Sequence, residues 1–480
     1  MGELDFGQIK RRTVSGVLAL TSRTALLQVI SFLGTFLLTI FLAPEIFGVF
    51  FVVSAIVAFL NYFSDIGLAA ALIQKKEKIT SADLKTTFTI QQLLVGLVVI
   101  LALFFSTKIS QFYHLSSDGL WLFRSLVLAF FLSSLKTIPS VLLERQLEFN
   151  RLIIPQIIEV FCFYFLAVFL AWKGWGIKSF TYAVFFRGIS GLIAIYWFQP
   201  WLPGFSFDKK SAKNLLSFGI PFQLNSFLGL IKDDLLTIYL GKILPFAQVG
   251  YLGWAKKWAE TPLRLFMDSV IKVTFPAYSR LQQHPEKLKK AINKAFFFLI
   301  LFVLPMAIGL ILTIKPLIFL IPKYQKWQPA LISFYFFVLS SVMATFSTPL
   351  TNALNALGKI KITLKLMIMW TLLTWVLTPV FIHFLGYQGM AFAAFMIGLS
   401  SFLVVFVAKK YLQFNILVNI YPSIFSSLIM AGFLFLIKSK LTATFSTLFL
   451  YILLGGIIYS VSLFLFFRNK ITAELKSVLK

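Results

Sequence analysis

Residues 251–280 read YLGWAKKWAETPLRLFMDSVIKVTFPAYSR, a stretch that is apolar enough for a membrane helix yet charged at regular intervals. The charges recur every four positions, at Lys256, Glu260, Arg264, Asp268 and Lys272. Residues four apart lie on nearly the same face of a helix, so these side chains form one charged stripe. An ionised side chain at the centre of a bilayer costs about 2.5–3.5 kcal/mol. The stretch is therefore either an amphipathic helix on the membrane surface or a span whose stripe lines a wet cavity.

The composition places the whole chain in a membrane. Its 480 residues are 59% hydrophobic and 13% charged, which is far from the balance of a soluble globular protein. The single Cys162 excludes a disulfide framework, and the three scattered His show no ligand spacing, so we expect no metal site. The net charge of +27 comes in short clusters between apolar runs, which is typical of cytoplasmic loops. We expect no nucleic-acid partner.

Apolar windows of about 20 residues predict fourteen membrane-spanning helices. They lie at 15–42, 46–66, 87–106, 120–142, 153–172, 179–198, 215–240, 247–275, 295–314, 330–354, 364–384, 389–408, 419–437 and 444–467. With the N-terminus inside, the inner segments hold 26 Lys and Arg and the outer loops hold 9. If residues 251–280 did not span, every later loop would change sides and this bias would be lost. The count favours a spanning stretch and two cytoplasmic termini.

The spans contain more basic than acidic side chains. Nine Lys and Arg lie within the first eight spans, at Arg23, Arg124, Lys136, Arg187, Lys232, Lys256, Lys257, Arg264 and Lys272. We expect Lys136 and Lys272 to reach the membrane surface from helix ends. The other seven predict a cationic cavity that binds an anionic substrate, because opposite charges 4 Å apart attract by about 4 kcal/mol at an effective dielectric constant of 20. Structural pairing of Glu260 with Arg264 and of Asp268 with Lys272 is the alternative for those four residues.

Other residues within the spans suit an ion-coupled protein that changes shape. Glu159, Asp233 and Asp234 are candidates for ion coupling, since acidic side chains inside a membrane often mark ion pathways. Gly219, Pro221 and Pro262 are candidate hinges, because proline removes a helix hydrogen bond and permits bending. Static kinks at these positions are the alternative.

An internal repeat divides the chain. LLTIFL at 37–42 and LLTIYL at 235–240 end the first and seventh spans, and FGVF at 47–50 is echoed by VGYL at 249–252. A repeat of six helices keeps both copies in the same orientation. We therefore predict an N-lobe at 1–200 with helices 1–6, a C-lobe at 201–410 with helices 7–12, and two extra C-terminal helices with a cytoplasmic tail at 411–480.

The motifs of common enzymes are missing from the sequence. It contains no G-x-x-x-x-G-K-[ST], H-E-x-x-H or G-x-S-x-G, so we expect neither an ATP-binding loop nor a hydrolytic centre. A membrane-embedded polysaccharide polymerase or ligase would need a large outer loop, and the predicted outer loops are short. We expect a protein that is not an enzyme and has no cofactor.

Four motifs carry a resemblance to a known family. They are DIGL at 65–68 with AALIQKKE at 70–77, ERQLEFN at 144–150, FPAYSRLQ at 275–282, and Lys326-Trp327 ahead of a span. In this order and spacing they resemble the polysaccharide-transporter flippases. These are Wzx-like proteins, closest to the colanic-acid-exporter type, in the multidrug/oligosaccharidyl-lipid/polysaccharide exporter superfamily.

The resemblance implies an all-α fold of two six-helix lobes around a central cavity that opens alternately to either side of the inner membrane. It implies transport of polyprenyl-pyrophosphate-linked oligosaccharides to the outer leaflet, with membrane lipids, a polysaccharide polymerase and chain-length machinery as partners. In related flippases the first, second, seventh and eighth helices line the cavity, which matches Arg23 and the charges between 232 and 272. An ion-coupled multidrug extruder of the same superfamily is the alternative. A polymerase or ligase is the less well supported one.

Overall fold

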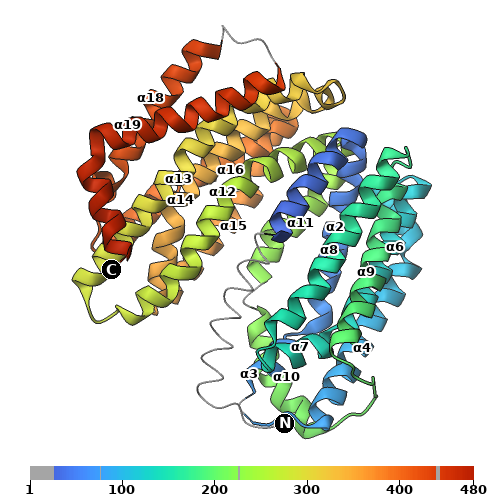
Figure 1. The fold of residues 1–480 in the computed structure, drawn as a ribbon. Coiled ribbons are helices and arrows are strands. Elements are labelled where there is room, and N and C mark those ends of the chain that lie inside the picture. Colours follow the sequence, from blue (N-terminus) through green and yellow to red (C-terminus); the bar gives the residue numbers. More distant parts are fainter. Residues whose placement is uncertain (1–25, 76, 225–226, 439–443, 480) are drawn as a thin grey trace. The chain divides into compact units, whose positions relative to one another are not determined.

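The computed structural model describes residues 26–75, 77–224, 227–438 and 444–479, and these residues form helices and loops without a strand (Figure 1). The chain divides into two compact units, Met1–Gly250 (unit 1) and Tyr251–Lys480 (unit 2). The predicted all-α class is confirmed over the described residues. The lobe boundaries at 200 and 410 remain a prediction, whereas compactness alone separates the two units within one helix, at residue 250.

The described part of unit 1 begins with an apolar helix at Leu26–Phe41. The following helices are α2 (Pro44–Asp65), α3 (Leu68–Gln74), α4 (Ser81–Phe104), α5 (Ser106–Tyr113), α6 (Ser117–Ser134), α7 (Thr137–Arg145), α8 (Phe149–Trp172), α9 (Lys178–Phe198), α10 (Lys209–Leu224), α11 (Phe227–Ile243) and the start of α12 (Phe246–Arg280). α8 packs along α9, α6 packs on α4 and α9, and α11 packs on α2. The short helices α3 and α7 lie with α10 at one end of the unit (Figure 1).

Local sequence explains several helix boundaries in unit 1. Pro44 occupies the first turn of α2, where the backbone N–H groups have no partner within the helix, so its lack of an N–H costs no hydrogen bond. The Thr80 hydroxyl accepts a hydrogen bond from the Asp83 N–H at 3.1 Å, and the Asp83 carboxylate accepts one from the Thr80 N–H at 2.9 Å. This reciprocal capping box begins α4. Gly174 follows α8 and has a φ of 81°, a left-handed backbone conformation that residues other than glycine rarely adopt.

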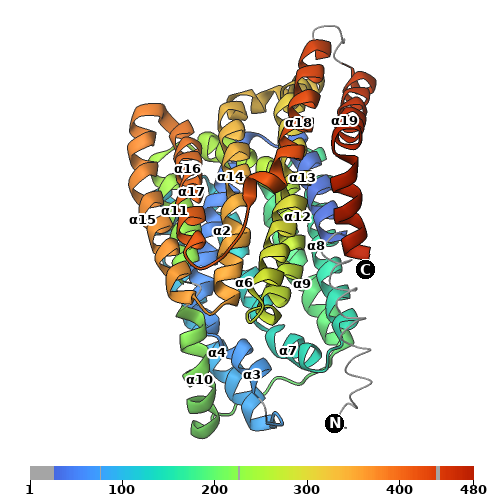
Figure 2. The ribbon, with the colours of Figure 1, turned by 90° about the vertical axis from the view of Figure 1, so that its left-hand side faces the viewer.

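Unit 2 is built on the rest of α12. It continues with α13 (Pro285–Leu320), η1 (Pro322–Ala330), α14 (Leu331–Ala356), α15 (Ile360–Leu385), η2 (Gly386–Gln388), α16 (Gly389–Leu399), α17 (Ser401–Lys409), α18 (Ile416–Lys438) and α19 (Phe445–Leu479). α13 packs on α14 and α18, and α18 packs on α19, as Figure 2 shows for the two C-terminal helices beside α13. α14 also packs on α16 and α17.

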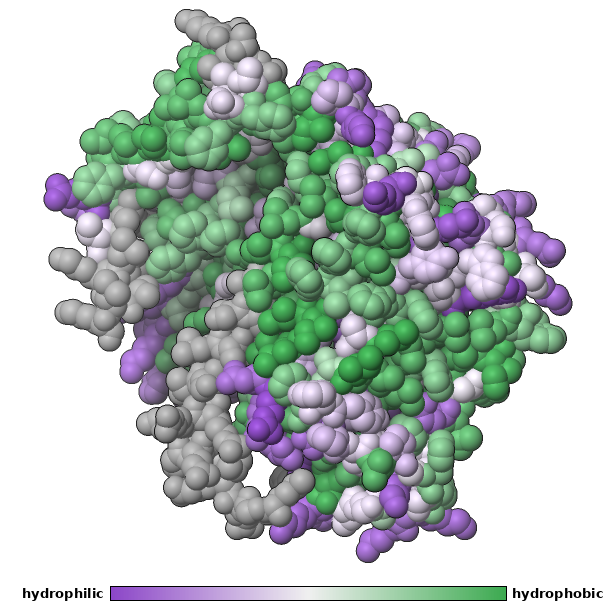
Figure 3. All heavy atoms as spheres, turned by 45° about the vertical axis from the view of Figure 1, so that its right-hand side comes forward, coloured by the Kyte–Doolittle hydropathy of each residue, from purple (hydrophilic) through white to green (hydrophobic). Residues whose placement is uncertain are grey.

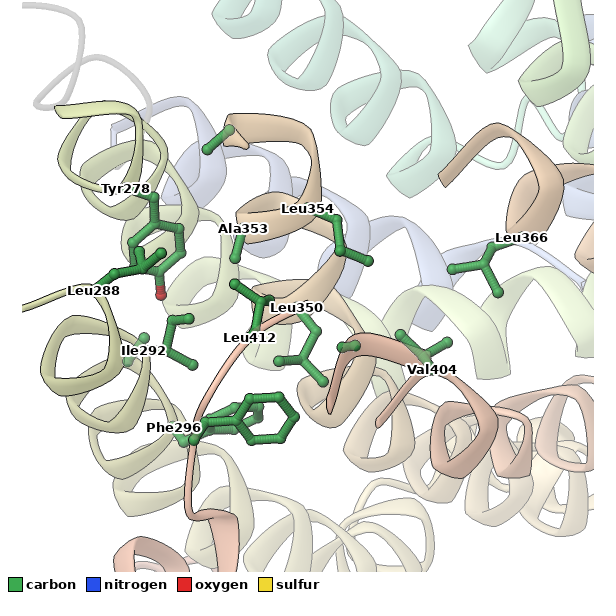
Figure 4. Packing of buried hydrophobic residues seen from close by; sticks show 14 residues of the cluster. Tyr278, Leu288, Ile292, Phe296, Leu350, Ala353, Leu354, Leu366, Val404 and Leu412 are labelled. Carbon is green, nitrogen blue, oxygen red and sulfur yellow. The ribbon is translucent and has the colours of Figure 1, made fainter. Parts of the chain in front are cut away.

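A compact apolar cluster closes one end of unit 2 (Figure 4). Tyr278, from the FPAYSRLQ motif on α12, is fully buried there with Phe296 of α13 and Leu350 of α14. Val404 of α17 completes the contact from the other side. The motif that resembled a family signature therefore contributes to packing at this point of the fold.

Nine stretches of the described residues are long and apolar enough to cross a membrane, or ten if the bent pair α6 and α7 counts as one. This confirms a multi-pass membrane protein, and the helix order is consistent with the predicted fourteen spans. Figure 3 shows hydrophobic side chains over much of one face, with hydrophilic side chains gathered toward its margins. Two predicted spans are each divided: 120–142 into α6 and α7, and 389–408 into α16 and α17. The predicted span 215–240 covers parts of α10 and α11, and residues 225–226 between them lie outside the described residues.

The predicted repeat has a reciprocal contact at its centre. A Cβ atom added to Gly48 on α2 would overlap the carbonyl oxygen of Phe246, and one added to Gly250 on α12 would overlap the carbonyl oxygen of Pro44. Both glycine positions and both carbonyl positions are separated by 202 residues, which is the spacing of FGVF at 47–50 and VGYL at 249–252. The first turns of α2 and α12 thus cross through equivalent glycines, because only glycine lets two backbones approach this closely.

Candidate functional site

The structure brings Lys136, Glu159 and Arg187 together in unit 1. The Lys136 Nζ lies 2.6 Å from the Glu159 Oε1, and the Arg187 Nε lies 3.8 Å from the Glu159 Oε2. The Lys136 and Glu159 side chains are each 13% exposed, whereas that of Arg187 is 50% exposed. The Arg187 guanidinium also lies 6.0 Å from the ring centroid of Phe163. We call these three charged residues the α6–α9 triad.

The triad lies at mid-depth of the helices that carry it. Glu159 is the eleventh of 24 residues in α8, and Arg187 is the tenth of 21 in α9. Lys136 lies at the break between α6 and α7, whose axes differ by 41°. The expectation that Lys136 reaches the membrane surface from a helix end is therefore wrong. The break places its ammonium group inside the unit, where it pairs with the Glu159 carboxylate.

Gly191 on α9 leaves the space that the Glu159 carboxylate occupies. A Cβ atom at this position would overlap the Glu159 side chain. Three residues away on the same helix, Gly188 lies against α6, where an added Cβ would be 3.5 Å from the Ala129 Cα. Sequence reasoning missed both glycines and the role of Lys136. Their signal is the short spacing of small residues in α9, since small residues allow close helix packing in membranes.

A cavity of 330 Å³ extends from the triad along α7. Its polar lining consists of Ser133, Lys136, Thr137, Ser140, Glu144, Gln156 and Glu159, and its apolar lining of Ala69, Ile73, Val141, Leu152, Pro155 and Ile195. Lys136 and Glu144 lie eight residues apart across α7, which corresponds to about 12 Å of helix. The cavity thus connects mid-depth of unit 1 with the end of α7.

The side chain of Arg145 holds the end of α7 through hydrogen bonds to main-chain carbonyl oxygens. Its guanidinium donates to the carbonyl oxygens of Leu72 at 2.8 Å and Glu77 at 3.1 Å, and also to that of Lys75. Lys75 in turn pairs with the nearly fully buried Asp83 at 2.8 Å. The two motifs at 65–77 and 144–150 therefore form one structural cluster, in which Arg145 caps the carboxyl end of α3.

The other predicted cationic residues lie elsewhere. Arg23 lies outside the described residues. Arg124 donates from Nε to the Ser106 Oγ at 3.2 Å, and its guanidinium lies 5.4 Å from the ring centroid of Trp121. Arg264 is 62% exposed and pairs with Glu260 at 3.0 Å, four residues earlier on α12. The structural pairing of Glu260 with Arg264 is thus observed.

The charged residues of α11 and α12 belong to different units. Lys232 and Asp234 are half-buried and Asp233 is exposed on α11 of unit 1. Lys256 and Lys257 are half-buried on α12 of unit 2. Both of these Lys and both of the Asp residues take part in further polar or ring interactions. That these residues line one anion-binding cavity remains a prediction.

The three candidate hinge residues lie inside continuous helices. Gly219 and Pro221 belong to α10, and Pro262 belongs to α12. A Cβ atom on Gly219 would be 2.5 Å from the Ile66 carbonyl oxygen, and Gly67 beside it has a φ of 70°. Gly219 therefore allows α10 to approach the turn before α3. A hinge role for these three residues remains a prediction.

Residues 37–332 of the chain match the family described as polysaccharide biosynthesis protein. The chain is 23% identical over 370 residues to the lipopolysaccharide biosynthesis protein WzxC of Escherichia coli (strain K12), covering 76% of this chain and 74% of that protein. Among solved structures it is similar to the lipid II flippase MurJ in an inward closed conformation, with a TM-score of 0.76 and 19% identity over 94% of this chain and 99% of that one. It is also similar to an inward-facing multidrug resistance MATE family transporter of the MOP superfamily, with a TM-score of 0.58 and 16% identity over 82% and 99%. These likenesses establish a transporter fold.

Proposed function

The chain belongs to the polysaccharide biosynthesis protein family, and from this we propose that it is a lipid flippase for polysaccharide export. It moves polyprenyl-pyrophosphate-linked oligosaccharide units from the cytoplasmic to the outer leaflet of the inner membrane. The family match carries the proposal, and two observations support it. A relative is named a lipopolysaccharide biosynthesis protein, and the structural neighbour with the TM-score of 0.76 is named a lipid II flippase.

The physical task of such a protein is to carry a hydrophilic head through hydrocarbon. Unsatisfied polar groups are costly there, so the protein supplies water and cations to the head while the polyprenyl tail stays in lipid. In this proposal Arg23, Lys232, Lys256 and Lys257 bind the pyrophosphate, because Lys and Arg form strong charge-assisted hydrogen bonds with phosphate oxygens. Arg124, Arg187 and Arg264 add to the positive potential that attracts the anion.

The transport cycle we propose is alternating access by rocking of two lobes around the bound head. The excess of Lys and Arg in the predicted inner segments supports two cytoplasmic termini. The protein catalyses no covalent step in this scheme, and it hands its cargo to a polysaccharide polymerase and chain-length machinery at the outer leaflet.

A second candidate function is multidrug extrusion, which the likeness to the MATE transporter favours. That likeness covers 82% of the chain, against 94% for the lipid II flippase. A site for organic cations would also need an excess of acidic residues, whereas the predicted spans hold an excess of basic ones. The flippase is therefore the better supported function.

Translocation of a lipid-linked oligosaccharide in reconstituted vesicles tests the proposal, with an impermeant probe that reads the leaflet of the sugar head. We expect the wild-type protein to flip this lipid and a variant with Arg23, Lys256 and Lys257 changed to Gln to lose most of the rate. The matched control changes the exposed Lys287, Lys361 and Lys365 to Gln and removes the same charge. A wild-type protein that moves organic cations but no such lipid would support multidrug extrusion instead.

A further inference from the structure

Unit 1 keeps three charges at mid-depth, where each ionised side chain is costly. Glu159 is the only acidic partner of Lys136 and Arg187 among the ion pairs of the described residues. Charged side chains inside membrane proteins usually face a polar interior and mark ion pathways or substrate sites. Neither the pyrophosphate proposal nor helix packing requires a carboxylate between two cations at this position.

The helix that carries Lys136 is broken at that depth. α6 ends at Ser134, α7 begins at Thr137, and the 41° bend lies between them. Broken helices in transporters expose backbone and side-chain groups to binding sites, and non-helical backbone is tolerated there where it lines a water-filled space. The hydroxyl group of Tyr196 donates to the Leu135 carbonyl oxygen at 3.1 Å and so satisfies one of the groups left by the break.

The cavity along α7 gives water a path to this break. Its 330 Å³ holds about ten water molecules at roughly 30 Å³ each. Three hydroxyl groups line it, on Ser133, Thr137 and Ser140, and the last two lie between Lys136 and Glu144 in the sequence. Glu144 lies at the end of α7, beside the segment that the distribution of Lys and Arg places inside the cell. The cavity therefore extends from Glu159 toward the predicted inner side.

Glu159 is the candidate for ion coupling that lies beside the cavity along α7. A proton needs a single carboxylate and a chain of water or hydroxyl groups to reach it. Of the three candidates for ion coupling, Asp233 has an exposed side chain, and Glu159 is the one in the lining of the cavity along α7.

We propose that Glu159 is the proton-coupling residue of the transport cycle and that the cavity along α7 is its aqueous route to the inner side. The proposal rests on the flippase function proposed above. A hydronium ion in the cavity transfers a proton to a Glu159 carboxylate oxygen, so that one O–H bond of the hydronium breaks, the carboxyl O–H bond forms, and a water molecule is left. The neutral carboxyl group no longer compensates the positive charges of Lys136 and Arg187, so the Lys136 ammonium moves away from Glu159. The angle between α6 and α7 is then free to change.

The surroundings of Glu159 contain the charges that this exchange needs. Lys136 faces it from the break, Arg187 from α9, and Glu144 lies further along the same cavity. Tyr196 of α9 is bonded to the backbone of the break. The helix Leu26–Phe41, which contacts α8 through Tyr164, has no charged residue in its described range. The charge of the carboxylate thus decides whether both cations stay in place.

Proteoliposomes with an imposed pH gradient and a trapped pH indicator test the coupling. In the wild type we expect the gradient to change the rate of lipid flipping several-fold, with proton movement that follows flipping. Glu159→Gln should flip at one rate whatever the gradient and move no protons, while Glu159→Asp should recover part of the response. The control Glu286→Gln removes a 74% exposed carboxylate outside the triad and should respond like the wild type.

The outcomes separate the two proposals. A wild-type protein that flips the lipid at a rate independent of the gradient overturns proton coupling and leaves the flippase function intact. A wild-type protein that flips no lipid overturns the flippase function itself. A Glu159→Gln variant that still moves protons with the lipid excludes Glu159 as the coupling residue.

Cysteine labelling tests the water path without any transport. In a Cys162→Ser background, we expect Ser140→Cys to react with an impermeant thiol reagent added from the inner side, because this position lines the cavity. The control Ile154→Cys is 42% exposed on α8, outside the cavity lining, and should react slowly if lipid covers it. An unreactive Ser140→Cys in a correctly inserted protein contradicts the aqueous route.

Discussion

The α6–α9 triad and the middle of α12 both contain acidic and basic side chains within predicted spans, but they pair them in different ways. Lys136 and Glu159 come from different helices, and their side chains are each 13% exposed. Glu260 and Arg264 are neighbours on one helix, and the Arg264 side chain is 62% exposed. A pair that water can replace contributes little to stability, whereas a buried carboxylate depends on its partner. Burial therefore decides which of the two ion pairs contributes more to the stability of the fold.

The largest effect should follow from Lys136→Met, which removes the nearer partner of Glu159. Breaking one side of a buried ion pair typically costs about 3–5 kcal/mol, because the other charge stays buried without compensation. We expect the free energy of unfolding in detergent to fall by this amount. The double variant Lys136→Met/Glu159→Leu should recover most of this free energy, since it removes both buried charges of the pair. Equal stability of the single variant and the wild type would contradict the distinction.

Gly191→Ala should have the next largest effect on stability. Its Cβ would overlap the Glu159 carboxylate, and forced overpacking costs typically about 1–3 kcal/mol. Thermal unfolding measures the loss. The matched control is Gly309→Ala in α13, where an added Cβ meets nothing within 4 Å and a helical Ala is favoured over Gly by roughly 0.5–1 kcal/mol. If both variants lower stability alike, the packing at Gly191 is not what holds Glu159 in place.

Arg264→Gln should have the smallest effect on stability. Exposed ion pairs of this kind contribute about 0.2–1 kcal/mol, so the unfolding temperature should hardly change. The flipping assay gives the second readout, because Arg264 is among the residues proposed to attract the anionic substrate. A loss of several kcal/mol on this substitution would show that solvent does not reach Arg264 in the membrane, and the comparison with the triad would fail.

Much of the fold follows from the sequence because a membrane helix is recognised from the hydropathy of consecutive residues. Apolar windows locate the helices, and a membrane requires that each helix satisfies its own backbone hydrogen bonds. The four-residue spacing on α12 predicts the Glu260–Arg264 pair for the same reason, since both residues lie on one helix. The echoed motifs lead to Gly48 and Gly250, whose reciprocal contacts appear in the structure.

The candidate site was less accessible to prediction. Lys136, Glu159 and Arg187 all lie inside predicted spans, but the position of Lys136 near the end of an apolar window predicts that its side chain reaches the membrane surface. The break at residues 134–137 moves it to mid-depth, and no local pattern announces the carboxylate 23 residues later as its partner. Gly191 has no distinctive signal until the carboxylate beside it is known.

By itself the sequence determined that this is an all-helical membrane protein with an excess of positive charge in its spans, because hydropathy and charge are properties of each residue and its near neighbours. It also determined where helix ends and echoed motifs lie. Only the tertiary structure decided which charges meet, which are buried, and where a cavity reaches them. Those outcomes depend on how helices far apart in the chain pack together, and the free energy of an ion pair depends on that packing more than on the residues that form it.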